Sequence, residues 1–222
     1  MLADRRLIVV ERVDDALHTL GTRAMHPGDV VTVGRAAELP LGYTTDARIS
    51  RLAVSVTCTD AGWAIESTNR NGVLIHPWGL PPRYARRDET TAAPRVALRI
   101  VGSIVREHWV LLEDDTRLTS GPTAGPTAGP PDGPNQAELE ALRLVFPDLL
   151  EWPPVLAEWP PGIEHVASHL RITPETLMRQ LEGVRARASG LGLPPEVTVA
   201  DPEYVHLLVQ SGWLRPELFP SQ

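Results

Sequence analysis

The chain has 222 residues, of which 42% are hydrophobic and 22% charged, a composition typical of a soluble globular protein with one large domain or two small ones. No apolar run reaches the roughly 18–20 residues that a helix needs to cross a bilayer, and the early charges at Asp4, Arg5 and Arg6 speak against a signal peptide. The single cysteine, Cys58, excludes an internal disulfide framework and suits a reducing compartment, so we expect a cytoplasmic protein.

Charge is distributed unevenly along the chain. All 21 basic residues are arginine, and residues 1–119 hold 15 of them against 15 acidic residues. Residues 120–222 hold 6 arginines against 13 acidic residues, which accounts for the whole net charge of −7. Because duplex-binding domains usually carry net positive charge, this balance disfavours DNA binding by the second half.

Short apolar runs separated by turn signals fill the first half of the chain. Residues 53–58 alternate between apolar and polar side chains, and Asn71-Gly72 is a strong hairpin signal before the run that follows it. We predict strands over residues 7–10, 30–33, 53–58, 63–65, 73–75, 95–101 and 108–112. Short strands at near-regular spacing predict a β-sandwich.

Residues 120–135 repeat the sequence Gly-Pro-Thr-Ala. Proline removes amide donors and glycine adds conformational freedom, so neither a helix nor a packed strand is expected there. We interpret this segment as a linker between a domain at residues 1–119 and a domain at residues 136–222. Thr123 and Thr127 within it are candidate targets of a kinase.

The apolar period changes to that of helices after the linker. We expect helices over residues 137–150, 163–170 and 173–188, and a last one that Asp201 caps. Thr173 is a favourable cap for the third helix, with Pro174 at its first position. Residues 197–199 are predicted as a short strand. The second domain is therefore expected to be all-α, of a winged helix-turn-helix type.

Three motifs occur in order within the predicted sandwich. Gly34-Arg35 ends a strand, Ser50-Arg51 closes the sequence Asp-Ala-Arg-Ile-Ser-Arg, and Asn71-Gly72 closes Ser-Thr-Asn-Arg-Asn-Gly. In this order, and over residues 5–115, they resemble the glycine-arginine, serine-arginine and asparagine-glycine elements of the forkhead-associated (FHA) domain family. The resemblance implies an FHA-type β-sandwich that binds phosphothreonine on a protein partner and catalyses no reaction.

The chemistry of a phosphate receptor agrees with the residues at the first two motifs. A phosphothreonine carries a charge of about −2 near neutral pH and three strong acceptor oxygens, so its receptor needs a fixed cation and short neutral donors on loops of a rigid scaffold. Arg35 can supply a planar guanidinium, Ser50 a hydroxyl and Arg51 a second cation. The resemblance implies that these three residues hold the phosphate.

The third motif is implied to contact the peptide itself. In the family an asparagine at this position binds the peptide backbone, which here indicates Asn71. Asn69 is the alternative, because Asn-Arg-Asn leaves the register open by two residues. Arg70 lies at a loop position that can also face the ligand.

One residue departs from the family pattern. The family usually has a structural histidine, which fixes the binding loops, where this sequence has Ala53. The absence of this histidine predicts that the binding loops are held less firmly, although no charged contact to the phosphate is removed. The residues alone also allow a second interpretation. Arg35 and Arg51 would then be surface arginines paired with nearby acidic residues, and Asn71-Gly72 would be an ordinary type I′ turn.

The second domain contains a weaker resemblance. Residues 138–190 resemble the helix-turn-helix that follows FHA domains in some actinobacterial proteins. The matching stretch is residues 163–181, where Arg171 replaces the common turn glycine. If the motif bound DNA, the first turn of its second helix would approach base edges, where Glu175 would be unfavourable beside phosphate. The candidate DNA-contacting or partner-contacting residues are Thr176, Arg179, Arg185 and Arg187.

Enzymatic and metal chemistry have little support in the sequence. His165 and His169 have the i, i+4 spacing of metal ligands, but no third ligand is evident, so a solvent-facing helix side is the simpler interpretation. Ser50 has no accompanying histidine and aspartate in a hydrolase arrangement. We therefore expect no enzyme activity, no cofactor and no metal.

These observations lead to one hypothesis and two alternatives. The hypothesis is a phosphothreonine-dependent adaptor in bacterial serine/threonine kinase signalling, whose partner is a phosphorylated protein such as a kinase or its substrate. The first alternative is a phosphorylation-linked transcription regulator that binds DNA through residues 136–222. The second is a structural interaction protein whose FHA-like domain has lost phosphate recognition.

Overall fold

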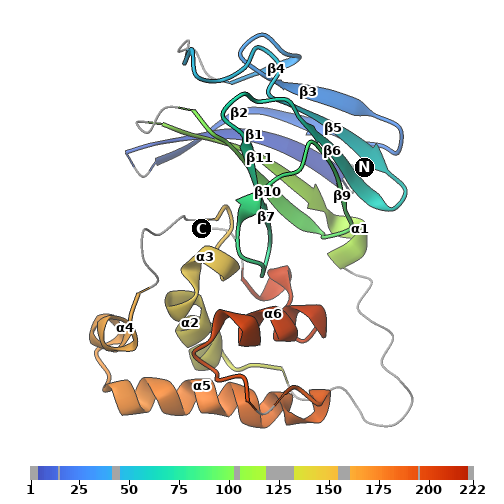
Figure 1. The fold of residues 1–222 in the computed structure, drawn as a ribbon. Coiled ribbons are helices and arrows are strands. Elements are labelled where there is room, and N and C mark those ends of the chain that lie inside the picture. Colours follow the sequence, from blue (N-terminus) through green and yellow to red (C-terminus); the bar gives the residue numbers. More distant parts are fainter. Residues whose placement is uncertain are drawn as a thin grey trace. The chain divides into compact units, whose positions relative to one another are not determined.

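A computed structural model of the chain describes residues 5–14, 16–41, 46–102, 106–118, 133–154, 161–194 and 196–219 (Figure 1). The chain divides into two compact units. The first consists of residues Met1–Trp78 and Pro82–Thr119, and the second of Gly79–Pro81 and Ser120–Gln222. Most of the predicted linker, with Thr123 and Thr127, lies outside the described residues.

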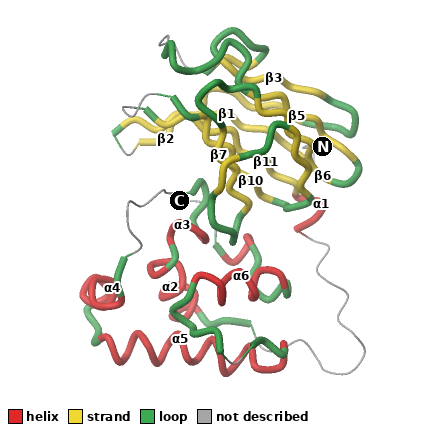
Figure 2. The backbone as a smooth tube through the Cα atoms, in the orientation of Figure 1, coloured by secondary structure: helices red, strands yellow, loops and turns green. Residues whose placement is uncertain are grey.

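Two sheets make up the first unit, as the yellow strands in Figure 2 show. The six-stranded sheet has the order β2-β1-β11-β10-β7-β8, and the five-stranded sheet has the order β4-β3-β5-β6-β9. The strands are β1 (Arg5–Val13), β2 (Ala16–Ala24), β3 (Val30–Gly34), β4 (Leu39–Pro40), β5 (Val54–Thr59), β6 (Gly62–Ser67), β7 (Val73–Pro77), β8 (Arg83–Tyr84), β9 (Asp88–Thr91), β10 (Arg95–Ile100) and β11 (Glu107–Asp114). A short helix, α1 (Asp115–Leu118), follows β11.

The hydrophobic core lies between the two sheets. In β5 the side chains of Val54, Val56 and Cys58 are fully buried and alternate with half-buried polar residues, as expected for a strand with one face on a core. Residues from both sheets belong to the same buried cluster, including Val110 and Leu112 from β11. The first unit is therefore a β-sandwich, which confirms the predicted strand-rich fold.

The predicted strands are all present, but others were missed. Each of the seven predicted strands corresponds to β1, β3, β5, β6, β7, β10 or β11, although the predictions at 53–58 and 95–101 extend one residue beyond β5 and β10. The sequence did not indicate β2, β4, β8 or β9. β2 is largely exposed and lacks a buried face, so its side chains show no alternation, and the others are only two to four residues long.

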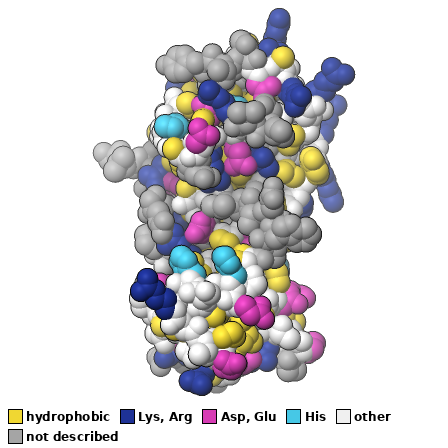
Figure 3. Space-filling model, turned by 90° about the vertical axis from the view of Figure 1, so that its left-hand side faces the viewer, with side chains coloured by type: hydrophobic (Ala, Val, Ile, Leu, Met, Phe, Trp, Pro, Cys, Tyr) yellow, Lys and Arg dark blue, Asp and Glu magenta, His cyan; other side chains and the backbone are white. Residues whose placement is uncertain are grey.

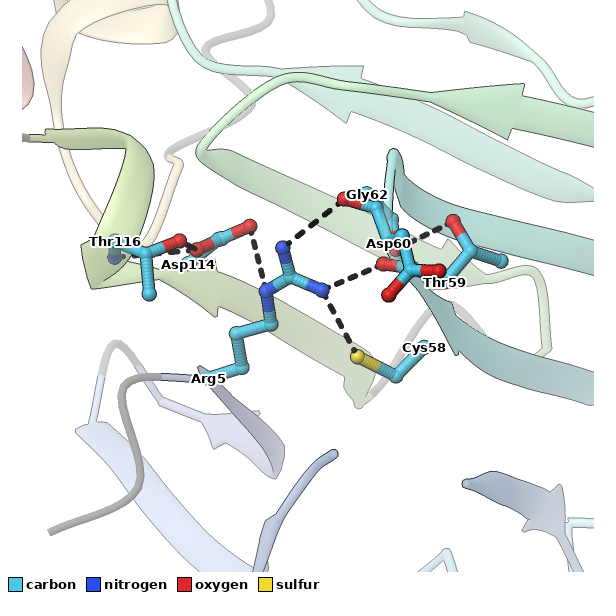
Figure 4. A network of polar contacts seen from close by, with 7 residues as sticks. All are labelled: Arg5, Cys58, Thr59, Asp60, Gly62, Asp114 and Thr116. Atoms are coloured by element: carbon cyan, nitrogen blue, oxygen red, sulfur yellow. Dashed lines mark hydrogen bonds and ion pairs between the residues drawn. The ribbon is translucent and has the colours of Figure 1, made fainter. Parts of the chain in front are cut away.

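The side chain of Arg5 connects the two sheets at one end of the sandwich (Figure 4). Arg5 Nε lies 2.9 Å from Asp114 Oδ2, whose side chain is fully buried. The same guanidinium donates to the carbonyl oxygen of Thr59 at 2.5 Å and lies 3.4 Å from Cys58 Sγ. Because Arg5 and Asp114 belong to one sheet and Cys58 and Thr59 to the other, these contacts join the sheets where β1 begins and β5 ends.

Helices form the second unit, shown in red in Figure 2. Helix α2 packs against α4 and α5, and α4 also packs against α5. The helices are α2 (Gln136–Val145), α3 (Pro147–Leu150), α4 (Ile163–Leu170), α5 (Pro174–Ala188) and α6 (Pro202–Gln210), with short 3₁₀ turns η1 (Ser189–Leu191) and η2 (Pro216–Leu218). No helix in the described part of the chain is long and apolar enough to cross a membrane.

The helix predictions are largely confirmed, with two corrections. The first predicted helix is divided at Phe146 into α2 and α3, because Pro147 disfavours helical backbone at the residue before it. The predicted strand at residues 197–199 is wrong, since this segment forms bends and turns. In the described part of the second unit there is no strand with which it could pair.

A short turn connects α4 to α5. Arg171 adopts the left-handed conformation, with φ 57° and ψ 39°, where a glycine is common. Thr173 caps α5 by accepting a hydrogen bond from the Thr176 amide, and Pro174 occupies the first turn, as the sequence predicts.

Glu138 connects α2 to α5 through hydrogen bonds of its carboxylate. Its carboxylate accepts the Asn135 amide at 2.8 Å, which completes a capping box, and accepts Arg187 Nε at 3.1 Å. The side chain is only 6% exposed. This residue therefore stabilises both the start of α2 and its packing against α5.

Replacing Glu138 by alanine should lower the free energy of unfolding of the second unit by about 1–3 kcal/mol, because the cap and a partly buried charged hydrogen bond are both lost. Chemical denaturation followed by the helical circular dichroism signal measures the change. Glu140→Ala, at an exposed position of the same helix, is the matched control and should change stability little. Equal effects of the two substitutions would contradict this role of Glu138.

Candidate functional site

The candidate site begins where β3 ends, at a place without room for a side chain. A Cβ atom on Gly34 would lie 2.8 Å from the Ala53 amide nitrogen and collide with the carbonyl oxygen of Arg51. Only glycine lets these two backbone segments approach so closely. The glycine of the first motif therefore allows the loop at residues 46–53 to lie against the end of β3.

Backbone hydrogen bonds then fix this loop beside Arg35. The Arg35 amide donates to the carbonyl oxygen of Ser50 at 3.1 Å, and the Ala36 amide donates to that of Arg51 at 2.9 Å. The first and second sequence motifs are thus joined through their main chains, and their side chains start from the same end of the sandwich.

The Arg35 side chain is oriented by the same loop. Its Nε donates to the carbonyl oxygen of Ile49 at 2.5 Å, which leaves the two terminal nitrogens of the guanidinium for a ligand. Arg35 is half-buried, and in the described part of the chain no carboxylate forms an ion pair with it. The described contacts of Arg35 are therefore not those of an arginine in a surface ion pair, and its terminal nitrogens are able to donate to an anion.

Ser50 joins the second motif to the third. Its Oγ accepts a hydrogen bond from the Arg70 amide at 2.9 Å. A serine hydroxyl has one donor and two acceptor positions, so this contact fixes the oxygen and leaves the hydroxyl hydrogen to donate to a ligand.

The two asparagines of the third motif have different surroundings. Asn69 is buried, with 7% exposure, and its side chain accepts the Ser50 amide at 3.0 Å and donates to the carbonyl oxygens of Gly72 and Val101 at 2.8 Å each. Asn71 is exposed and donates to the carbonyl oxygen of Arg48 at 2.8 Å. Asn69 thus holds three loops together, whereas Asn71 is the asparagine that a ligand can reach.

Three further arginines lie on the loops that contact Arg35 and Ser50 through the main chain. Arg51 and Arg70 are exposed, as is Arg48, which the sequence analysis missed although it precedes Ser50 by two residues in the same loop. Among the described residues none of these three side chains forms an ion pair. The loop acid Asp46 instead accepts the Arg48 amide at 3.0 Å. Four guanidinium groups therefore extend from connected loops without carboxylate partners in the described part of the chain.

Ala53 occupies the position where the family pattern has histidine. It is fully buried, its amide donates to Val33 at 2.9 Å, and its carbonyl oxygen accepts the Thr68 amide at 3.0 Å. The Thr68 hydroxyl also donates to the carbonyl oxygen of Leu52 at 2.9 Å. The loops here are joined by main-chain contacts, Thr68 and Asn69, so no side chain at position 53 is required to connect them.

His108 is a buried group at the same end of the sandwich. Its side chain is 1% exposed, and its Nδ1 lies 3.7 Å from Glu11 Oε1. Burial lowers the pKa of His108 below the ordinary value of 6.5, and the positive charge of Arg106 lowers it further. The negative charges of Glu11 and Asp46 raise the pKa but do not outweigh these two effects. The imidazole is therefore held in its neutral form near pH 7.

The candidate contact residues of the second unit are arranged differently. Arg187 is paired with Glu138, and Arg185 donates to the carbonyl oxygen of Val197 while its guanidinium lies 5.6 Å from the centre of the Tyr204 ring. Thr176 is half-buried, and Arg179 is exposed. Of the four candidates, Arg179 is thus the one whose side chain is exposed and has no hydrogen bond or ion pair with another described side chain or carbonyl group.

Figure 3 shows several dark blue arginine side chains along the margin of the first unit, and both units carry acidic and histidine side chains on the face drawn. His165 and His169 are exposed on α4, and no group of three or more potential metal ligands occurs among the described residues.

Comparisons with known proteins give similarities in solved structures alone. No family model matches the chain, and no curated protein sequence is significantly similar to it. The MEK1 FHA domain is 19% identical, with a TM-score of 0.39, over 51% of this chain and 92% of that domain. The FHA domain of the CT664 protein from Chlamydia trachomatis is 19% identical, with a TM-score of 0.36, over 49% and 97%. The N-terminal FHA domain of Saccharomyces cerevisiae Rad53p, solved with a phosphothreonine peptide, is 12% identical, with a TM-score of 0.34, over 51% and 98%.

Replacing Gly34 by alanine should destabilise the first unit by about 1–3 kcal/mol, because the new Cβ forces the backbone at residues 51–53 away from β3. Urea denaturation measures the loss. Gly21→Ala is the matched control, since its Cβ would meet Leu39 at an ordinary 3.6 Å. A Gly34→Ala protein as stable as the control would show that the close approach is not required.

The buried imidazole predicts a pH-dependent stability. The unfolded chain takes up a proton on His108 near pH 6.5, whereas the folded chain does so only at lower pH, so the free energy of unfolding falls as the pH drops below about 6.5. The contribution is at most about 1.4 kcal/mol per pH unit. His108→Gln should reduce this slope in denaturation measured between about pH 7 and pH 5.

His18→Gln is the control for this measurement, because His18 lies exposed on β2. It should leave the slope unchanged. A His108→Gln slope equal to that of the unchanged protein would show that the buried imidazole does not govern this pH window.

Proposed function

We propose that the first unit binds a phosphothreonine-containing segment of a partner protein. The observation that carries this proposal is the group of four arginines, Arg35, Arg48, Arg51 and Arg70, on loops connected through Ser50. Among the described residues they have no carboxylate partners. Like charges held close together repel one another, so an anionic ligand is the natural complement of this arrangement.

The groups at the site suit a phosphate in particular. The Arg35 guanidinium presents a planar pair of donors, which matches two phosphate oxygens, and the Ser50 hydroxyl adds a short neutral donor. A phosphate of charge about −2 leaves part of the positive charge uncompensated, so the neighbouring residues of the ligand can be acidic. The three motifs that resemble the FHA family support threonine as the residue that carries the phosphate.

The peptide around the phosphate would be bound by Asn71. Its side chain is exposed on the loop next to Arg70 and is anchored by its hydrogen bond to Arg48. An amide side chain offers both a donor and an acceptor, which suits the main chain of an extended peptide. Binding of this kind is reversible and makes or breaks no covalent bond, so we propose a regulatory adaptor and not an enzyme.

For the second unit we favour binding of a protein over binding of DNA. Two of the four candidate contact residues, Arg185 and Arg187, are already bound to other residues of the same unit. Few arginines of this unit then remain to neutralise phosphates of a DNA duplex, and such neutralisation supplies most of the non-specific affinity for DNA. The chain would act in the cytoplasm of a bacterium, in signalling by a serine/threonine kinase.

Replacing Arg35 by alanine should weaken binding of a phosphothreonine peptide by about 2–5 kcal/mol, because one partner of a desolvated charge pair is removed. Isothermal titration calorimetry with phosphothreonine, phosphoserine and unphosphorylated forms of the same peptides measures this loss. Arg23→Ala is the control, since it removes the same charge from β2. It should leave the affinity nearly unchanged.

Two results would contradict the proposal. Absence of binding to every phosphopeptide of a diverse library would indicate a sandwich that has lost phosphate recognition. Equal losses for Arg35→Ala and Arg23→Ala would indicate a diffuse charge effect and no defined receptor.

A further inference from the structure

Tyr84 is the most exposed of the large hydrophobic side chains in the described part of the chain. Its relative exposure is 66%, compared with 54% for Val30 and 40% for Leu52. An aromatic ring in water leaves a large apolar area unburied, and such residues often mark binding surfaces.

The ring is held on a fixed piece of backbone. Tyr84 is the last residue of β8 and pairs with Leu74 of β7. The following residue, Ala85, donates its amide to the carbonyl oxygen of Val73 at 2.8 Å. On the other side, Arg83 donates to Glu89 Oε2 at 3.0 Å, in an ion pair that holds the pKa of Glu89 below its ordinary value. An anchored aromatic residue loses little conformational entropy when a ligand binds it.

Tyr84 lies directly beside the third sequence motif. A Cβ atom on Gly72 would lie 3.0 Å from Cε1 and 3.1 Å from Cδ1 of the tyrosine ring. Gly72 also has a φ of +92°, which side chains other than glycine rarely adopt. The absence of a side chain at position 72 therefore lets the ring lie against the loop that carries Asn71.

We propose that the Tyr84 ring is an apolar subsite that selects one residue of the bound phosphopeptide. This inference rests on the proposed function, because the same peptide must be held at Arg35 and Ser50. A peptide backbone bound by Asn71 would pass beside Gly72, where the exposed ring offers a surface to one flanking side chain. The peptide side chain that contacts the ring would be aliphatic or aromatic, because removing apolar surface of the ring from water lowers the free energy of the complex.

The test uses phosphothreonine peptides with alanine at every other position, into which a single leucine or phenylalanine is moved along both sides of the phosphothreonine. The unchanged protein should prefer the apolar residue at one position by about three- to tenfold over alanine. Tyr84→Ala should remove this preference and leave binding of the all-alanine phosphopeptide intact. Tyr84→Phe should keep the preference, because the ring is retained.

Leu17→Ala is the matched control, since it removes another exposed apolar side chain, from β2. It should retain the preference of the unchanged protein. Circular dichroism verifies that each variant is folded.

The outcomes separate the subsite from the proposed function. A position preference that persists in Tyr84→Ala would overturn the subsite while phosphothreonine binding stands. An equal loss of affinity for all peptides in Tyr84→Ala would overturn it too, because the ring would then support the loop without selecting a residue. Failure of the unchanged protein to bind the all-alanine phosphopeptide and every apolar variant would overturn both proposals.

Discussion

The arrangement of the site depends on the buried amide of Asn69. One side chain accepts a hydrogen bond from Ser50 and donates to Gly72 and Val101, so it connects three loops that are far apart in the sequence. A buried amide with these partners is costly to leave unsatisfied, and the loops therefore have one favourable arrangement. With the loops fixed, arginines that would repel one another in a flexible chain are kept at one end of the sandwich.

The sandwich supplies the rigidity that this arrangement requires. At the opposite end, Arg5 pairs with Asp114 of its own sheet and donates to the backbone of Thr59 in the other sheet, and the core between the sheets is filled with branched and aromatic side chains. Strand ends anchored in such a core move little, so a loop of a few residues between them has little freedom. Exposed charge at one end of the unit is thus compatible with a stable fold because the apolar contacts lie elsewhere.

Much of this architecture could be predicted from the sequence, and the limits have physical causes. A strand that buries one face can be recognised from alternating apolar and polar residues. β2 lacks this pattern, because most of its side chains are exposed. The first two motifs predicted residues that the structure brings together. The choice between Asn69 and Asn71 could not be made from spacing alone, because it depends on which amide is buried. Arg48 was missed because its place beside Asn71 arises from a contact between loops.

The cations around the candidate site are all guanidinium groups, and the position where the family pattern has an imidazole is alanine. Guanidinium groups remain charged throughout the range of acidity that a cell experiences. A phosphate monoester, in contrast, loses one of its two negative charges as the pH falls through about 6. For the proposed phosphothreonine ligand, acidity would then be sensed by the ligand and not by the arginines, so mild acidification would weaken the proposed complex without titration of the arginine side chains.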